Sequence, residues 1–253
     1  MYKIDLNCDL GESTFDKPIL SDEKIISLIT SANIACGFHA GSPTVMKNTV
    51  ELCKRYNVNV GAHPSFYDRE NFGRKQMDLS YEDIKNLIIY QVSALNAFCN
   101  EVGVKLNHVK PHGALYNLAA KDEKIAKAIV EGVKIVNPDL ILMGLSGSVM
   151  LKVAKSENLK IASEVFADRA YEDDGSLVAR SKQGAMIENE DEAVSRVIKM
   201  IKTNKVTSIN GKEIDITPDT VCVHGDGEKA LLFVQKIKNA LNKENIEIGL
   251  ASR

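Results

Sequence analysis

Short strand-like runs alternate with helical patterns along almost the whole chain. The seven runs are Lys3–Cys8, Ala32–Phe38, Val58–His63, Asn107–Lys110, Leu140–Leu145, Lys160–Phe166 and Thr220–His224. Alternation of this kind is typical of a parallel sheet whose strands are joined by helices. An eighth short run could lie within Glu244–Leu250. We therefore predict an α/β fold with a closed or nearly closed β/α barrel of about seven strands; a doubly wound open sheet is the alternative.

The stretch after Ser80 gives the clearest helix. Apolar side chains recur from Ile84 to Val102 with the i, i+3, i+4, i+7 spacing of one helix face. Ser80 precedes acidic residues in a cap-like box, and Gly103 supplies the left-handed residue at which helices commonly end. The same spacing recurs within 125–136, 194–201 and 231–241. Helices thus fill the gaps between the predicted strands.

Two features interrupt this alternation. A polar loop runs from Asp168 to Asn189, and a hairpin is indicated around Asn210-Gly211. Long loops in compact domains are often functional, and Asn-Gly favours a tight turn between paired strands. Neither feature resembles a linker, and 253 residues match the roughly 250 of a typical barrel. We predict a single β/α-barrel domain over residues 1–253.

The charge balance argues against a polyanionic partner. Lys plus Arg number 32 and Asp plus Glu number 34, so no net field draws the chain to nucleic acid or to an anionic membrane. No apolar run approaches the roughly 20 residues that span a bilayer. The first residues alternate and carry charge, where a secretion signal needs an apolar stretch. We expect a small-molecule partner and a cytoplasmic location.

The five cysteines are isolated in the sequence. Cys8, Cys36, Cys53, Cys99 and Cys222 form no C-x-x-C pair, and their number is odd. This pattern fits reduced thiols better than a disulfide framework. Because free cysteines are among the most frequently buried residues, we interpret them as small core residues rather than nucleophiles.

The alternation of side chains within each strand predicts which residues face the barrel interior. One face of a barrel strand meets the helices and must be apolar, while the other points inward. In the first strand the apolar residues begin at Ile4 and end at Cys8. The inward residues are then Asp5, Asn7 and Asp9. The same argument turns inward Asn33, Gly37, His39, His63, His108, Lys110, His112, Glu164, Cys222, His224 and Asp226.

Eight of these residues should meet near the carboxyl ends of the strands, where barrel active sites are built. They are Asp9, His39, His63, Lys110, His112, Glu164, His224 and Asp226, and they include four of the five histidines. Each one alone is more often a hydrogen-bonded structural residue. Their joint placement favours an active site, because charged groups rarely gather in an apolar enclosure without a function.

Two motifs are excluded. The run His108 to His112 has the spacing of a helical metal pair, but Pro111 forbids a helix interior, so it is not a zincin motif. No G-x-x-x-x-G-K-[ST] segment is present, so the chain has no P-loop.

At the predicted strand ends the sequence resembles the LamB/YcsF family, the A subunits of prokaryotic 5-oxoprolinase. The matching segments are IDLNCDLGE (4–12), SANIACGFHAG (31–41), GAHPSFYDRENFGR (61–74), HVKPHGALYN (108–117), EVFADRAY (164–171), DGSLVARSKQGAMI (174–187) and VCVHGDGEKAL (221–231). Ser42 departs from the acidic residue of many members. The resemblance implies a distorted barrel like those of glycoside hydrolases and polysaccharide deacetylases. It also implies that separate B and C subunits are needed to convert 5-oxoproline, ATP and water to glutamate, ADP and phosphate.

The implied reaction suggests roles for the inward residues. A lactam is a poor electrophile, so ATP, acting with Mg²⁺, would phosphorylate the amide oxygen before water attacks. Such a scheme needs a base, a cation and a carboxylate anchor. We assign Asp9 or Asp226 as base and Lys110 as cation. The proton carriers would be His39, His63 or His112, and the substrate would bind to Asn7, Asn33, Arg74, Arg169 and Arg180, with Arg169 or Arg180 as the carboxylate clamp.

Two other functions remain open from the residues. A metal-dependent amide or carbohydrate deacetylase could use Asp9, His39 and His63 as ligands of a divalent transition metal. Alternatively, the chain could be a non-catalytic subunit whose inward cluster holds a small acid. Metal content separates the first alternative from the 5-oxoprolinase interpretation, and neutralising single inward carboxylates separates the second.

Overall fold

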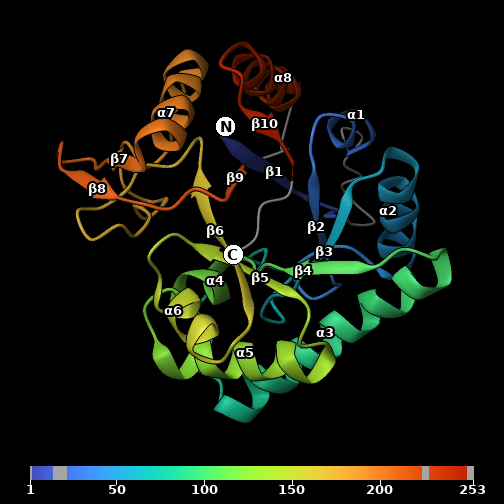
Figure 1. The fold of residues 1–253 in the computed structure, drawn as a ribbon. Coiled ribbons are helices and arrows are strands. Elements are labelled where there is room, and N and C mark those ends of the chain that lie inside the picture. The colour runs from blue at the N-terminus through green and yellow to red at the C-terminus, as the bar shows by residue number, and fades with distance from the viewer. Residues whose placement is uncertain (1, 14–21, 224–227, 250–253) are drawn as a thin grey trace.

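Seven parallel strands form a closed ring at the centre of the molecule (Figure 1). The computed structural model describes residues 2–13, 22–223 and 228–249. In ring order the strands are β1 (Lys3–Leu10), β2 (Ser31–Ala35), β3 (Asn59–His63), β4 (Leu106–Val109), β5 (Ile141–Leu145), β6 (Lys160–Phe166) and β9 (Thr220–Cys222). Strand β9 closes the ring because it pairs with both β6 and β1. The predicted seven-stranded barrel is confirmed, and the open sheet is excluded.

Three further strands lie outside the ring. The strand β10 (Glu247–Ile248) lies within the predicted eighth run and pairs with the first residues of β1. The predicted hairpin forms from β7 (Lys205–Thr207) and β8 (Glu213–Asp215), which pair antiparallel. Gly211 adopts φ +86° in its turn, a conformation open to glycine.

Helices surround the ring on its outer side (Figure 1). They are α1 (Asp22–Ile26), α2 (Pro43–Tyr56), α3 (Tyr81–Val102), α4 (Gly113–Ala119), α5 (Glu123–Val136), α6 (Val149–Ser156), α7 (Glu190–Thr203) and α8 (Glu228–Lys243). Ser42 and Ser80 cap α2 and α3 by accepting backbone N–H bonds, and Gly103 ends α3 at φ +77°. The outward side chains of β1, from Ile4 to Leu10, are fully buried in the core beneath these helices.

Two strands end two or more residues earlier than the sequence indicated. The strand β2 stops at Ala35, before the predicted Phe38, because the chain turns at Gly37 and Gly41, whose φ angles are +88° and +75°. The Arg69 guanidinium donates to both glycine carbonyls and holds this turn. The strand β9 stops at Cys222, and His224 lies outside the described residues. His39 therefore reaches the barrel from a loop rather than from a strand.

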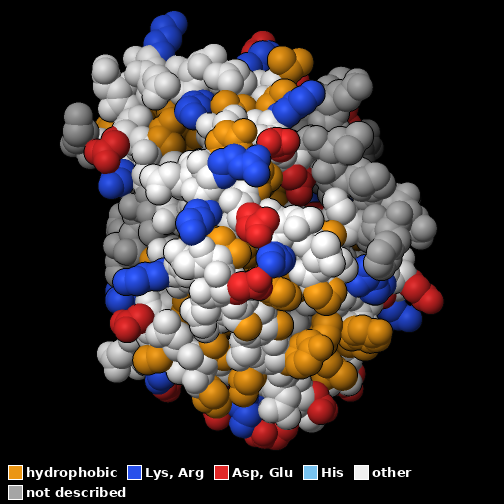
Figure 2. Space-filling model, turned by 90° about the vertical axis from the view of Figure 1, so that its right-hand side faces the viewer, with side chains coloured by type: hydrophobic (Ala, Val, Ile, Leu, Met, Phe, Trp, Pro, Cys, Tyr) orange, Lys and Arg blue, Asp and Glu red, His pale blue; other side chains and the backbone are white. Residues whose placement is uncertain are grey.

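The surface carries charges of both signs. On the face in Figure 2, Lys and Arg side chains are interspersed with Asp and Glu, while hydrophobic side chains gather toward one lower corner. This mixture agrees with the balanced composition and offers no extended basic surface on that face. Within the described ranges, no helix combines the length and the apolar character needed to cross a membrane.

The barrel interior leaves no room for a side chain at Gly61. A Cβ placed there would lie 1.9 Å from Nε2 of His108, on the neighbouring strand β4. Both residues belong to the wall of the ring, so relief would require the fully buried imidazole to move. Glycine at this position is thus a consequence of packing.

We predict that Gly61→Ala lowers the free energy of unfolding by about 3 kcal/mol, because overpacking a tight core costs about 1–3 kcal/mol or more. In the His108→Ala background the same change should cost at least about 1 kcal/mol less, since the clashing ring is gone. Urea unfolding of the two single variants and the double variant measures this coupling. Equal costs of Gly61→Ala in both backgrounds would contradict the steric explanation.

Candidate active site

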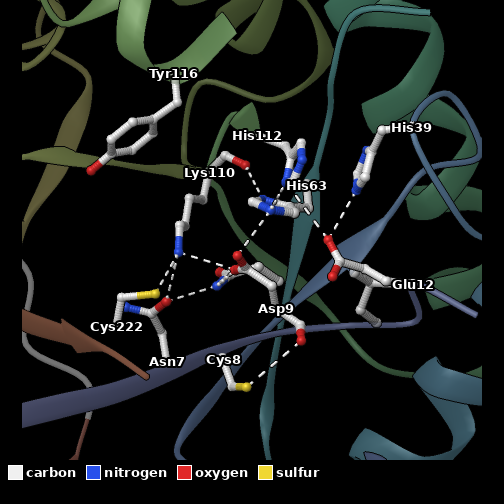
Figure 3. Close-up of polar contacts among 12 residues, drawn as sticks. Asn7, Cys8, Asp9, Glu12, His39, His63, Lys110, His112, Tyr116 and Cys222 are labelled. Atoms are coloured by element: carbon white, nitrogen blue, oxygen red, sulfur yellow. Dashed lines mark hydrogen bonds and ion pairs between the residues drawn. The ribbon is translucent and has the colours of Figure 1, made fainter. Parts of the chain in front are cut away.

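The ammonium group of Lys110 lies at the centre of the barrel interior (Figure 3). Its Nζ atom is 2.7 Å from Oε1 of Glu164 and 3.0 Å from Oδ1 of Asp9. It also donates to Oδ1 of Asn7 at 3.0 Å and to Sγ of Cys222 at 3.2 Å. Burial alone would lower the pKa of Lys110, but Asp9, Cys222 and Glu164 outweigh it and raise that pKa well above its usual value. Lys110 is therefore a fixed positive charge.

Glu164 is the buried counter-charge of Lys110. Its carboxylate has no solvent exposure and accepts from the Tyr116 hydroxyl at 2.6 Å and from the Asn7 amide at 3.1 Å. Burial and the neighbouring Glu164 raise the pKa of Tyr116 well above its usual value, so the phenol stays protonated and donates. These hydrogen bonds satisfy the carboxylate, which a buried charge requires.

A second polar layer supports this pair from below. The Asn33 amide donates to Asn7 at 2.7 Å and to Asp9 at 2.9 Å, and its oxygen lies 2.8 Å from Nε2 of His108. At the opposite end of the interior, Asp5 accepts from three hydroxyl groups. Their donors are Thr30, Ser31 and Thr220. The inward residues thus form a connected network, which keeps Asn7 and Asp9 in single orientations.

Asp9 joins the lysine group to a group of histidines. One carboxylate oxygen contacts Lys110, and the other lies 3.3 Å from Nε2 of His63. Nδ1 of His63 is 2.6 Å from the Lys110 carbonyl oxygen, to which it donates. The side chain of Asp9 keeps 14% of its surface exposed, whereas those of Lys110 and Glu164 keep 3% and 0%. Asp9 is therefore the member of this network best placed to meet a ligand.

Four further side chains bring donor atoms together beside Asp9: Glu12, His39, His63 and His112. Their donor atoms all lie within 4.8 Å of one another, and all four residues are buried. The imidazoles of His39 and His112 stack at 3.8 Å between ring centroids. Such a set of one carboxylate and three imidazoles is able to hold a transition-metal ion.

Burial keeps the rings of His39 and His112 neutral. Desolvation, with the nearby His112 and His63, lowers the pKa of His39 well below its usual value. Desolvation and His63 lower the pKa of His112 to about 3. At neutral pH both rings can therefore accept a proton or bind a cation through an unprotonated nitrogen.

A cavity of about 710 Å³ opens above this network. Its floor includes Asp9, Glu12, His63, Lys110 and His112. Its walls are built in part by residues 176–180 of the long loop. Its rim carries the exposed Arg74, Lys121 and Arg180, and the buried Arg169 also lines it. Desolvation and the neighbouring Arg180 lower the pKa of Arg169 to about 10, which still leaves it charged at neutral pH. An acidic floor below a basic rim suits a ligand with an anionic outer end.

The structure brings together six of the eight predicted catalytic residues: Asp9, His39, His63, Lys110, His112 and Glu164. The other two, His224 and Asp226, lie outside the described residues. Among the predicted substrate contacts, Arg74, Arg169 and Arg180 line the cavity. Asn7 and Asn33 are fully buried and are not among the described residues of its wall. They position Lys110 and Asp9 instead of reaching a ligand.

The predicted metal triad differs from the group that forms. Glu12 and His112 join His39 and His63, whereas Asp9 lies next to this group and also holds Lys110. The sequence reasoning missed Glu12 and Tyr116 as site residues. Both lie within segments already noted for their resemblance, 4–12 and 108–117, but on a loop and a helix, where strand alternation gives no signal.

Comparisons with known proteins agree over the full length. The LamB/YcsF family profile matches residues 4–253. A relative from Clostridium beijerinckii, named as the A subunit of 5-oxoprolinase, is 60% identical over 248 residues, covering 98% of this chain and 97% of the relative. The crystal structure of a lactam utilization protein from Thermus thermophilus has a TM-score of 0.92 at 40% identity, covering 98% of this chain and 100% of that one. A peptidoglycan N-acetylglucosamine deacetylase catalytic domain from Eubacterium rectale, at 10% identity and a TM-score of 0.51, covers 98% and 88% and shares the fold alone.

We predict that stability falls steeply as the pH drops from 6.5 to 5. The pKa values of His39, His108 and His112 are all lowered by burial, that of His108 to about 3. In this window the unfolded chain binds protons that the native protein does not, so each ring should contribute up to about 1.4 kcal/mol per pH unit. Urea unfolding at several pH values measures the slope. It should become shallower in His108→Gln, and an unchanged slope would contradict the assignment.

Proposed function

Because the chain belongs to the LamB/YcsF family, we propose that it is the A subunit of an ATP-dependent 5-oxoprolinase, a hydrolase that opens the lactam of 5-oxo-L-proline to L-glutamate. ATP is hydrolysed to ADP and phosphate in the same cycle. The observation that carries the proposal is the full-length similarity to a protein named as the A subunit of 5-oxoprolinase. The cavity adds independent support, since its floor offers acid–base groups and its rim offers cations.

The charges of the cavity orient the substrate. Lys110 and Asp9 at the floor, with the buried Glu164 behind them, together carry one net negative charge, which repels a carboxylate. The arginines of the rim attract it, and a guanidinium presents two parallel donors to a carboxylate. The lactam ring of 5-oxoproline then points inward and its carboxylate outward, toward Arg169 and Arg180.

The floor residues take roles set by their geometry. Lys110 stabilises negative charge that develops on the amide oxygen and on a transferred phosphoryl group. Asp9, which faces both Lys110 and His63, takes the proton from the attacking water. Asp9 then returns that proton to the ring nitrogen as the C–N bond breaks. Glu164, Asn7, Asn33 and Tyr116 act as positioning residues, because they contact Lys110 or Asp9 from buried positions.

The remaining parts of the proposal concern partners and setting. The chain works as one domain with the B and C subunits of 5-oxoprolinase, with ATP and Mg²⁺ as co-substrate. The cavity volume lies in the range that holds drug-sized ligands, so a five-membered lactam leaves room for a phosphoryl donor. A cytoplasmic location fits the five buried free cysteines, which suit a reducing compartment.

The reconstituted enzyme tests this function. We expect glutamate formation from 5-oxoproline and ATP to require this chain in addition to the B and C subunits. Lys110→Met and Asp9→Asn should each lower kcat at least about 100-fold, because each removes a charge from the reacting centre. Lys152→Met, an exposed change on α6, is the control. Thermal melting of each variant separates lost chemistry from lost folding.

The outcomes also separate the alternatives. Turnover that does not depend on this chain would refute its place in the 5-oxoprolinase complex and direct attention to deacetylase substrates. Binding of 5-oxoproline with full turnover in both floor variants would identify a non-catalytic binding protein.

We predict that Arg180→Ala raises KM for 5-oxoproline by about tenfold, since a hydrogen bond to a charged group contributes about 1.5–3 kcal/mol. Its kcat should change less than its KM, because Arg180 would anchor the carboxylate and contact neither atom of the scissile C–N bond. Arg55→Ala serves as the matched control, since Arg55 is exposed on α2 and pairs with Glu23. Steady-state kinetics of the assembled enzyme gives both constants. An unchanged KM would remove Arg180 from the carboxylate site.

A further inference from the structure

Two histidine nitrogens face each other at the cavity floor. Nε2 of His63 and Nδ1 of His112 are 2.9 Å apart. The other nitrogen of each ring is hydrogen-bonded to a backbone carbonyl oxygen. Nδ1 of His63 lies 2.6 Å from the Lys110 carbonyl oxygen, and Nε2 of His112 lies 2.9 Å from that of Phe72. Because a carbonyl only accepts, those two nitrogens carry the protons. With those nitrogens protonated, two neutral rings would direct lone pairs at each other, and a proton or a metal ion between or beside them would relieve that contact.

The Glu12 carboxylate lies beside these histidine nitrogens. Its Oε1 atom lies 3.6 Å from Nδ1 of His112 and 3.1 Å from Nε2 of His39. A metal ion with ligand bonds of about 2.0–2.1 Å separates neighbouring tetrahedral ligands by about 3.3 Å. The separations of 2.9, 3.1 and 3.6 Å bracket this value, and all four donor atoms lie within 4.8 Å of one another. Because an imidazole binds a metal in the plane of its ring, His39 must turn out of its stack with His112 when the four donors surround one ion.

Local structure places these donors beside one another. Gly11, at φ +68°, turns the chain from the end of β1 so that Glu12 points back toward the histidines. The His112 ring is fixed between the stacked ring of His39 and the Phe72 carbonyl, and its backbone N–H donates to Pro64. Backbone carbonyls that fix the tautomer are the outer contacts expected around metal-binding imidazoles. Figure 3 shows Glu12, His39, His63 and His112 pointing toward one another beside Asp9.

We propose that Glu12, His39, His63 and His112 bind one divalent first-row transition-metal ion at the cavity floor. Three imidazoles and one carboxylate favour zinc, iron or a metal of similar preference over calcium or magnesium. Glu12, His63 and His112 line the cavity, so the ion remains reachable by a ligand.

The consequence for catalysis rests on the proposed function. A metal ion at this position would polarise an amide carbonyl or lower the pKa of a bound water. Asp9 lies next to the site, 3.3 Å from Nε2 of His63, and could accept the proton of such a water. Metal binding itself does not depend on that function and is testable on the chain alone.

Metal content of the purified chain is the first measurement. We expect about one zinc, iron or manganese ion per chain by mass spectrometry after purification without added metal, or after dialysis against Zn²⁺. Glu12→Gln and His112→Gln should weaken binding at least tenfold. His108→Gln is the matched control: it removes another buried barrel histidine, whose Nε2 bonds to Asn33 outside this group. Its metal content should equal that of the unchanged chain.

Spectroscopy gives a readout that does not depend on variant folding. Co²⁺ bound to the unchanged chain should show the visible absorption of imidazole coordination, and Zn²⁺ should displace it. Anomalous diffraction at the metal edge should place the ion among the four side chains. Substoichiometric metal after incubation with Zn²⁺, Co²⁺ and Mn²⁺ would overturn the proposal and leave a proton between His63 and His112. Equal binding by Glu12→Gln and the unchanged chain would overturn the ligand set. Neither result bears on the oxoprolinase assay.

Discussion

The buried ammonium of Lys110 is the interaction on which the rest of the interior depends. Its acceptors come from three other strands of the ring: β1 through Asn7 and Asp9, β6 through Glu164, and β9 through Cys222. Removing one partner of a buried pair costs about 3–5 kcal/mol, because the remaining charge is left uncompensated. The same contacts that fix strand positions therefore also fix the groups that face the cavity. The Lys110 ammonium group therefore contributes both to the stability of the barrel and to the positions of the cavity-floor residues.

A connected polar interior also explains why the barrel can be packed without many apolar side chains inside. Asn33 links Asn7, Asp9 and His108, so each inward residue limits the orientation of the next. Fully satisfied networks of this kind are rigid, whereas partly satisfied ones are costly. Rigid donors suit a site whose chemistry depends on aiming a charge at a reacting bond.

Site residues on regular strands could be predicted from the sequence, whereas those on loops and helices could not. Strand alternation correctly turned Asn7, Asp9 and Glu164 inward, because side chains of a regular strand must alternate. It predicted His39 correctly as an inward residue but for the wrong reason, because β2 ends at Ala35 and the loop after it positions that ring. Glu12 and Tyr116 could not be found this way, because a glycine turn and a helix orient them. The predicted triad differs from the observed group of donor atoms because loops set the spacing of these atoms, and no periodicity encodes it.

The closure of the ring by β9 has a consequence for how the chain is made. Asp5 accepts a hydrogen bond from Thr220, and β1 pairs with β9 across more than 200 residues of sequence. During synthesis the first strand therefore leaves the ribosome long before its partner, with one edge and several polar side chains still exposed to water. Contacts so distant in sequence slow folding and prolong the lifetime of partly folded chains. The strand made first is among the last to be completed, so premature release or truncation before residue 220 would yield an open sheet prone to aggregation.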